Sequence, residues 1–255
     1  MNNLLRERSS VAHLSLLLLM ALCLFSKAHG ADRLPNSGQN DPLEPFNRTV
    51  MEINFLLDDA FLRPLSMFYR DITSPIFRQA ARNITQNLET PLVAANDALQ
   101  GDLEAASVSV ARFAVNSTIG ILGISDPATN LRLPHHHNDF GKTLFVYGLG
   151  DGPPIALPFR NIMPMRDAFG NAMGSVAEQT LAPWHEIDYA QTFVISAQMQ
   201  SIAGARTQYA PMIRQIRLSN DPYALSKTIM LQRRRAFLMG PQKIDVEALP
   251  NVELE

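Results

Sequence analysis

Several residue clusters in the chain have types that suit metal binding or phosphate chemistry. Three consecutive histidines at 135–137 are followed closely by Asp139. Consecutive histidines in an irregular segment rarely direct their nitrogens at one metal ion, and no second cluster completes a tetrahedral set. The stretch DFG at 139–141 matches a magnesium motif of kinases, but the glycine-rich loop, lysine and catalytic-loop residues of phosphoryl transfer are missing. We therefore expect no metal site.

Three glycines, Gly148, Gly150 and Gly152, could cradle a phosphate group. A phosphate loop leads from a strand into a helix, whereas Pro153 and Pro154 follow these glycines. We expect the glycines to give the backbone freedom in a turn.

An enzyme would need a nucleophile with a base and an orienting group. Ser117, His185 and Asp188 are of suitable types, but their surroundings resemble neither a nucleophile elbow nor a triad signature. The sequence therefore predicts no catalytic residues and no cofactor.

Two arginines, Arg48 and Arg112, lie within segments that are otherwise largely apolar. Each could hold a lipid phosphate or line a polar passage. Alternatively, each pairs with a nearby carboxylate such as Glu44, Glu52 or Glu104, because a lone charge in apolar surroundings is costly. We favour pairing.

The first thirty residues have the pattern of an export signal. Arg6 and Arg8 precede an apolar run at 14–24, which is too short to cross a bilayer core of about 30 Å. Small residues then suit cleavage after Gly30. We expect residues 1–30 to be a signal peptide.

The only cysteine, Cys23, lies inside this leader, so the cleaved chain would have no thiol. A bacterial lipoprotein signal also ends its apolar run at a cysteine, which becomes acylated. That signal needs a small residue where this chain has Leu22. We expect no acyl anchor on Cys23, and acylation is the alternative.

Composition restricts the class of protein. Removing the leader leaves about 225 residues, enough for one large domain. Hydrophobic residues make up 46% and charged residues 18%, and the formal charge is −2, which does not suit a nucleic-acid-binding protein. No later run approaches the roughly 20 apolar residues of a spanning helix.

The segment 46–62 is predicted to be a helix that is apolar around most of its circumference. Its polar residues share one narrow stripe: Arg48, Glu52, Asp59 and Arg63. Such a helix is either buried in a protein core or surrounded by lipid. We expect Phe55 and Leu56 to face lipid or the packed interior of a ring, and Pro64 to limit the helix.

Further helices are predicted at 103–120, 165–182, 186–206 and 222–239. Asp102 and Asp221 are suitable N-caps for two of them, and Gly240 ends the last one. Pro75 and Pro91 should break the preceding segment into short pieces.

The remaining segments are expected to be irregular. Residues 129–164 are rich in proline and glycine, with a short hairpin around 147–152. Residues 31–40 should form a flexible lead-in and 244–255 a loose acidic tail. The three arginines at 233–235 either complement a helix dipole or attract anionic head groups. The chain is therefore mainly α-helical, with one domain at 41–243.

Eight sequence blocks occur in the order of one known family. They are DPLEPFNR (41–48), LLDDAFLRPL (56–65), NITQNLETP (83–91), LQGD (99–102), RFAVNSTIGILGISDPA (112–128), DFGKTLFVYGLGDGP (139–153), RDAFG (166–170) and SNDPY (219–223). Over about 200 residues the chain resembles the VacJ/MlaA family of bacterial outer-membrane proteins.

The resemblance implies an all-α, ring-like domain embedded in the outer membrane, mostly in its inner leaflet, with a central amphipathic channel. It also implies removal of mislocalised phospholipids from the outer leaflet and their delivery to a periplasmic lipid carrier, often beside a trimeric porin. No bond would be made or broken.

On this basis six residues are assigned to lipid passage or gating: Gly148, Gly150, Gly152, Arg48, Arg112 and Asn116. The glycines would form a mobile turn at the channel mouth, or an ordinary tight turn. The alternative functions are a membrane-associated lipid hydrolase and a non-transporting periplasmic scaffold bound to a porin.

Overall fold

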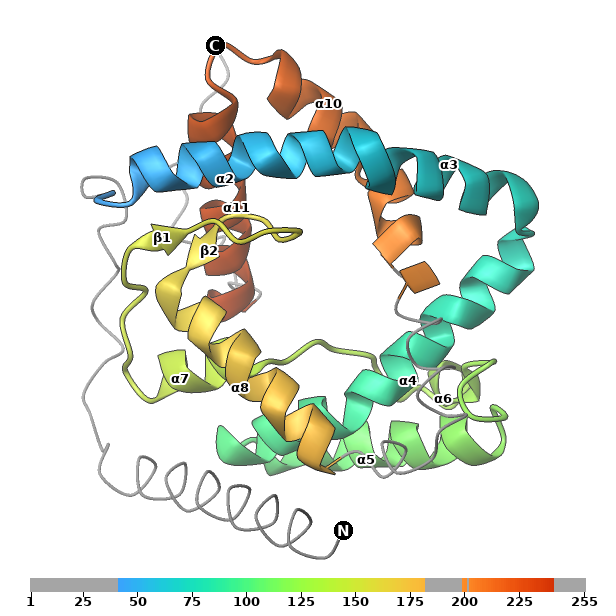
Figure 1. Cartoon of the computed structure of the whole chain (residues 1–255). Helices are drawn as coiled ribbons and strands as arrows, with labels where there is room; N and C mark the ends of the chain where they lie inside the picture. The colour runs from blue at the N-terminus through green and yellow to red at the C-terminus, as the bar shows by residue number, and fades with distance from the viewer. Residues whose placement is uncertain (1–40, 182–198, 201, 241–255) are drawn as a thin grey trace, which may run out of the picture.

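The computed structural model describes residues 41–181, 199–200 and 202–240. The predicted signal peptide, the lead-in at 31–40, the tail at 244–255, Cys23 and most of the predicted helix at 186–206 lie outside the described residues. Figure 1 shows the helices following one another around a ring, as the resemblance implied.

One side of the ring is a single helical rod made of three parts. α2 (Glu44–Leu57) leads into a π-helical turn, η1 (Asp58–Leu62), and then into α3 (Arg63–Ile72). The expectation that Pro64 limits the helix was wrong. The backbone N–H of Arg63 bonds to the carbonyl of Asp58, five residues earlier, and this wider turn makes room for the proline ring, which would clash with the carbonyl four residues earlier in a regular helix.

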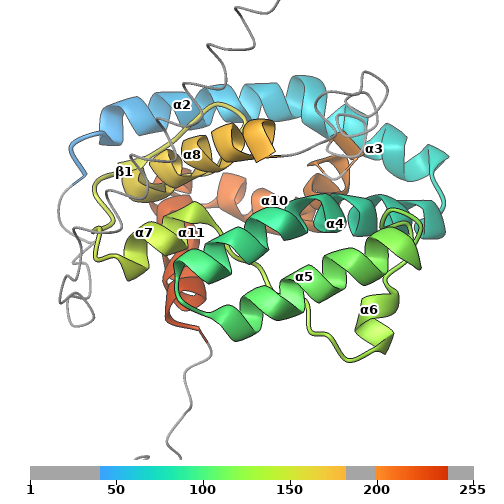
Figure 2. The same cartoon turned by 90° about the horizontal axis from the view of Figure 1, so that it is seen from below.

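The opposite side consists of α4 (Pro75–Leu99) and α5 (Leu103–Thr118), which pack side by side (Figure 2). The Ser74 hydroxyl caps α4 by accepting from the Phe77 N–H. Pro91 lies inside α4 without breaking it, so the predicted break was wrong. Packing against α5 buries several α4 side chains and offsets the backbone hydrogen bond that Pro91 cannot make.

α5 begins as predicted, because the Asp102 carboxylate accepts from the Ala105 N–H. Near its C-terminal end, side chains of α5 contact Asp126, the N-cap of α6 (Pro127–Asn130). We call this set of contacts the α5–α6 clasp. Arg112 Nη2 lies 2.9 Å from Asp126 Oδ2, and Asn116 Nδ2 donates to Asp126 Oδ1 at 2.9 Å. Arg112 therefore pairs, as favoured, but with Asp126 rather than with Glu104.

The proline- and glycine-rich stretch contains more structure than its composition indicates. α7 (Phe140–Val146) begins at Asp139, and β1 (Pro154–Ile155) pairs antiparallel with β2 (Met163–Pro164). The hairpin predicted around 147–152 is therefore displaced to 154–164. α8 (Met165–Leu181) follows β2 directly, near its predicted bounds.

The ring closes through helical residues 202–208, α10 (Ala210–Leu218) and α11 (Pro222–Met239). Asp221 caps α11 and Gly240 ends it, as predicted. Arg48 of α2 pairs with Glu44 and reaches Asp221 at 2.8 Å. The first and last described helices are thereby joined.

Two asparagines of α2, seven residues apart, hold the β1–β2 hairpin by its backbone. Asn47 donates to the Pro154 carbonyl at 2.9 Å and accepts from the Ala156 N–H at 2.8 Å. Asn54 donates to the Leu157 carbonyl at 2.9 Å. Two turns of helix place both amides on one face, where they substitute for a neighbouring strand.

We predict that Asn47→Ala lowers the free energy of unfolding by about 2–4 kcal/mol, because two buried backbone groups lose partners that are worth about 1–3 kcal/mol each. Urea unfolding followed by circular dichroism in detergent measures this. The exposed Gln86→Ala is the matched control and should change stability little. An equal effect of both changes would contradict the assignment.

The α5–α6 clasp should make the stability of the protein depend on pH through Asp126. Burial acts to raise the pKa of Asp126, but hydrogen bonds from Thr129, Asn116 and Arg112 outweigh it and lower the pKa to about 2. The folded value lies below the unfolded value, so this stabilisation is complete above about pH 4 and declines as the pH falls towards 2. Asp126→Asn should lower the melting temperature at pH 7 and flatten its decline between pH 4 and 2, unlike the exposed control Asp71→Asn.

Candidate functional site

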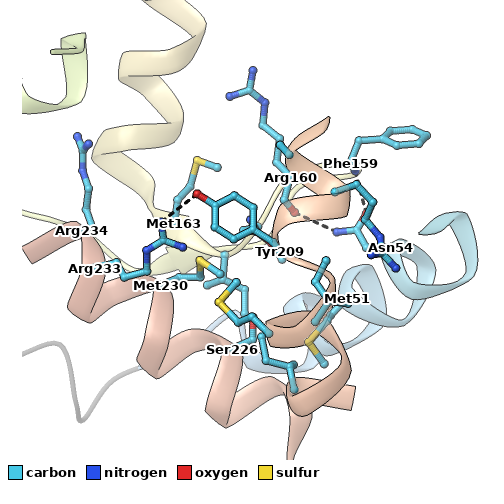
Figure 3. A pocket seen from close by; sticks show the side chains of 18 of the residues that line it. Met51, Asn54, Phe159, Arg160, Met163, Tyr209, Ser226, Met230, Arg233 and Arg234 are labelled. Carbon is cyan, nitrogen blue, oxygen red and sulfur yellow. Dashed lines mark hydrogen bonds between the residues drawn. The ribbon is translucent and has the colours of Figure 1, made fainter. Parts of the chain in front are cut away.

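A cavity of about 680 Å³ lies between α2, η1, the β1–β2 loop, α8, residues 202–216 and α11 (Figure 3). The elements that form it come from both ends of the described chain. It is therefore a product of ring closure.

Most of the cavity wall is apolar and adaptable. The methionines that line it come from four different elements: Met51, Met163, Met212 and Met230. Phe55, Ile162 and Phe237 also line it. Unbranched thioether side chains fill irregular space and repack easily. Such a wall suits flexible hydrocarbon better than a rigid ligand.

A buried carboxylate on the π-helical turn anchors one side of the cavity. Asp58 accepts from Arg206, and Arg217 Nη2 lies 2.9 Å from Asp58 Oδ2. The Arg217 guanidinium also lies 4.6 Å from the centre of the Phe55 ring. These contacts fix residues 206–217 against the α2–α3 rod.

A second ion cluster anchors the opposite side. Arg234 of α11 lies 2.6 Å from Asp139 Oδ2, at the start of α7, and 2.7 Å from Asp167 Oδ2 of α8. Burial acts to raise the pKa of Asp139, but the hydrogen bonds from Arg234 lower it overall. Arg234 is therefore more than a helix-dipole partner, which corrects the first of the two expectations for this member of 233–235; attraction to anionic head groups stays untested.

The histidine segment contacts several different partners. His136 Nε2 lies 2.8 Å from Asp97 Oδ2, whereas the His137 ring packs against Phe237 at a centroid distance of 5.7 Å. Burial lowers the pKa of His137. Across the described residues, no three His, Cys, Asp or Glu side chains are grouped as metal ligands.

The residues assigned to lipid passage do not line this cavity. Arg48 and Arg112 are ion-paired, and Asn116 belongs to the α5–α6 clasp. Phe55 lines the cavity, whereas Leu56 does not and has 69% of its surface exposed. The two neighbours therefore have different surroundings.

The glycine turn connects α7 to β1. Gly148 and Gly152 have φ of +85° and +65°, which L side chains rarely adopt, whereas a side chain at Gly150 would point into open space. The backbone geometry therefore requires glycine at 148 and 152 but not at 150. Ser117 hydrogen-bonds Asn87, and the other two triad candidates, at 185 and 188, lie outside the described residues.

The ring exposes many large apolar side chains. Large side chains are exposed along the rod and in the 119–124 loop: Leu56, Phe61, Leu65, Phe68, Ile72, Ile119, Ile121, Leu122 and Ile124. Ile121 and Leu122 are both held at positive φ, near +55°, a strained conformation for a bulky residue and above all for the β-branched Ile121. None of the helices in the described part of the chain has the length and hydropathy to cross a membrane.

Sequence reasoning missed Asp58, Arg160 and the four cavity methionines as site residues, and it named Arg234 only as a member of 233–235, without its partners. Asp58 could have been noticed as a carboxylate in an apolar helix. The methionines are spread from position 51 to 230, and no local pattern connects them.

Comparison with known proteins identifies related sequences and a related structure. A sequence model of the MlaA lipoprotein family matches residues 39–237. Proteins of Escherichia coli strain K12 and Shigella flexneri, each named intermembrane phospholipid transport system lipoprotein MlaA, are 31% identical over 225 residues, covering 85% of both chains.

A solved structure from work on the structural basis for maintenance of bacterial outer membrane lipid asymmetry aligns with a TM-score of 0.63 and 30% identity. It covers 78% of this chain and 100% of its own. Together with the helical ring, these matches show that the chain belongs to the MlaA lipoprotein family.

Proposed function

We propose that the protein is an outer-membrane component of phospholipid transport, which removes mislocalised phospholipids from the outer leaflet and passes them to a periplasmic carrier. The observation that carries this proposal is the amphipathic cavity, about 680 Å³ in volume, in a ring that also exposes many large apolar side chains.

The two surfaces have different roles. The exposed side chains of the α2–α3 rod and the 119–124 loop would contact hydrocarbon, so the ring lies in the inner leaflet and reaches the periplasmic side. The methionine-rich wall would accept acyl chains, while the charged ends of the cavity meet the head group. Lipid then moves without any bond being made or broken.

The cavity and the exposed apolar side chains also suggest two protein partners. A periplasmic lipid-binding protein would receive the lipid, and a trimeric porin would cover part of the apolar outer surface. The related proteins are named lipoproteins, whereas for this chain cleavage after Gly30 without acylation of Cys23 remains our prediction.

Filling the cavity should block lipid passage. Ala205 lines the cavity, so Ala205→Trp places an indole in it, and we expect transfer of phospholipid from vesicles to fall on the order of tenfold, equivalent to about 1.4 kcal/mol. Fluorescent-lipid transfer and surface labelling of outer-leaflet phospholipid in cells both measure this.

The matched control is Ala236→Trp, an exposed position of α11 that does not line the cavity. Equal transfer by both variants would contradict the proposed route. Release of fatty acid by the purified protein would instead indicate the lipid hydrolase, and membrane localisation without any lipid uptake would indicate the scaffold.

We propose that the glycine turn moves during lipid passage. Substitutions at its three glycines should distinguish an effect on stability from an effect on this movement. Gly148→Val and Gly152→Val should lower stability by about 1–2 kcal/mol each, because left-handed backbone disfavours a side chain. Gly150→Val should leave the melting temperature unchanged but slow lipid transfer. Unchanged transfer in the Gly150 variant would show that the turn is a connection only.

A further inference from the structure

We propose that the cavity selects phospholipids with an anionic head group by holding the lipid phosphate with Arg160 and Arg233. This inference rests on the function proposed above and concerns which lipids the same cavity takes.

The carboxylates of the cavity wall are already neutralised. Asp58 is paired with Arg206 and Arg217. Asp139 and Asp167 share Arg234. Each of these carboxylates accepts charged hydrogen bonds from guanidinium groups fixed in the fold, so none is available to a ligand cation.

Two guanidinium groups of the wall, those of Arg160 and Arg233, have no carboxylate partner in the described part of the chain. Arg233 instead lies 5.3 Å from the centre of the Tyr209 ring and contacts its hydroxyl at 3.5 Å. Both arginines are exposed within the cavity lining, so their donors are open to a ligand.

The two arginines come from fixed positions on different elements. Figure 3 shows Arg160 rising from the β1–β2 loop and Arg233 from α11. The loop is held by Asn54, which donates to the Arg160 carbonyl at 3.1 Å and accepts from the Phe159 N–H at 2.8 Å. Phe159 itself has a φ of +59°. Arg160 is therefore presented by a backbone that is already ordered.

This charge distribution distinguishes between head groups. A planar guanidinium forms two parallel hydrogen bonds with a phosphate. The ammonium of a zwitterionic head group would enter a region with excess positive charge and no free carboxylate among the described residues. A glycerol head group carries no cation and avoids that repulsion. The cavity should therefore favour phosphatidylglycerol over phosphatidylethanolamine.

The test uses the full-length protein and vesicles of equal phosphatidylglycerol and phosphatidylethanolamine. Lipid bound to the re-isolated protein is quantified by mass spectrometry. We expect the wild-type protein to be enriched in phosphatidylglycerol roughly fivefold, which corresponds to a total preference of about 1 kcal/mol. The double variant Arg160→Gln with Arg233→Gln should bind the vesicle ratio, with total lipid largely retained.

Arg214→Gln is the matched control, because Arg214 is exposed on α10 and does not line the cavity; it should keep the wild-type preference. Wild-type protein that binds the vesicle ratio, or a double variant that keeps the preference, would overturn the inference and leave the transport proposal intact. Absence of bound lipid in every variant would overturn both.

A second arm separates lipid phosphate from a free anion. Inorganic phosphate at millimolar concentration should not displace bound lipid from the wild-type protein, because it makes no contact with the apolar wall. Displacement that depends on Arg160 and Arg233 would reassign the pair to a free phosphate and overturn the inference.

Discussion

Polar contacts between segments far apart in sequence hold this ring closed. A ring of helices leaves little volume for a central hydrophobic core, and the main buried apolar cluster consists of Val50, Ala156, Ile162 and Tyr223. Asn47 contacts Pro154 and Tyr223, and Arg206 reaches Asp58 across 148 positions. Because breaking a buried ion pair leaves an unpaired charge, these contacts oppose opening of the ring and define one geometry.

The same contacts determine the electrostatics of the cavity. A ligand channel with free carboxylates and guanidinium groups would bind many polar solutes. Here Asp58, Asp139 and Asp167 form ion pairs with the arginines that close the ring. The structural ion pairs thus leave the cavity with apolar walls and a small excess of positive charge. Ring closure and ligand preference are consequences of one arrangement.

The sequence predicted features that depend on neighbouring residues. Asp102 and Asp221 were identified as caps because a cap acts within three residues, and the Arg48–Glu44 pair follows from helical spacing. Pro91 was misjudged because packing of α4 on α5 outweighs its local cost. The partners of Arg112 and Arg234 depend on the tertiary path of the chain, and no local pattern encodes them.

The π-helical turn shows how a local irregularity serves the whole ring. A regular helix through 58–62 would bring the Pro64 ring against the carbonyl of Ala60, four residues earlier, and would rotate the following residues relative to α2. The wider turn keeps the rod continuous while Asp58 faces the cavity and Asp59 meets Arg217 at 2.7 Å. One helical rod can therefore present Asn47 and Asn54 to the hairpin and two carboxylates to the closing segment. Its exposed side chains, such as Leu56 and Phe61, are those that we propose to contact hydrocarbon.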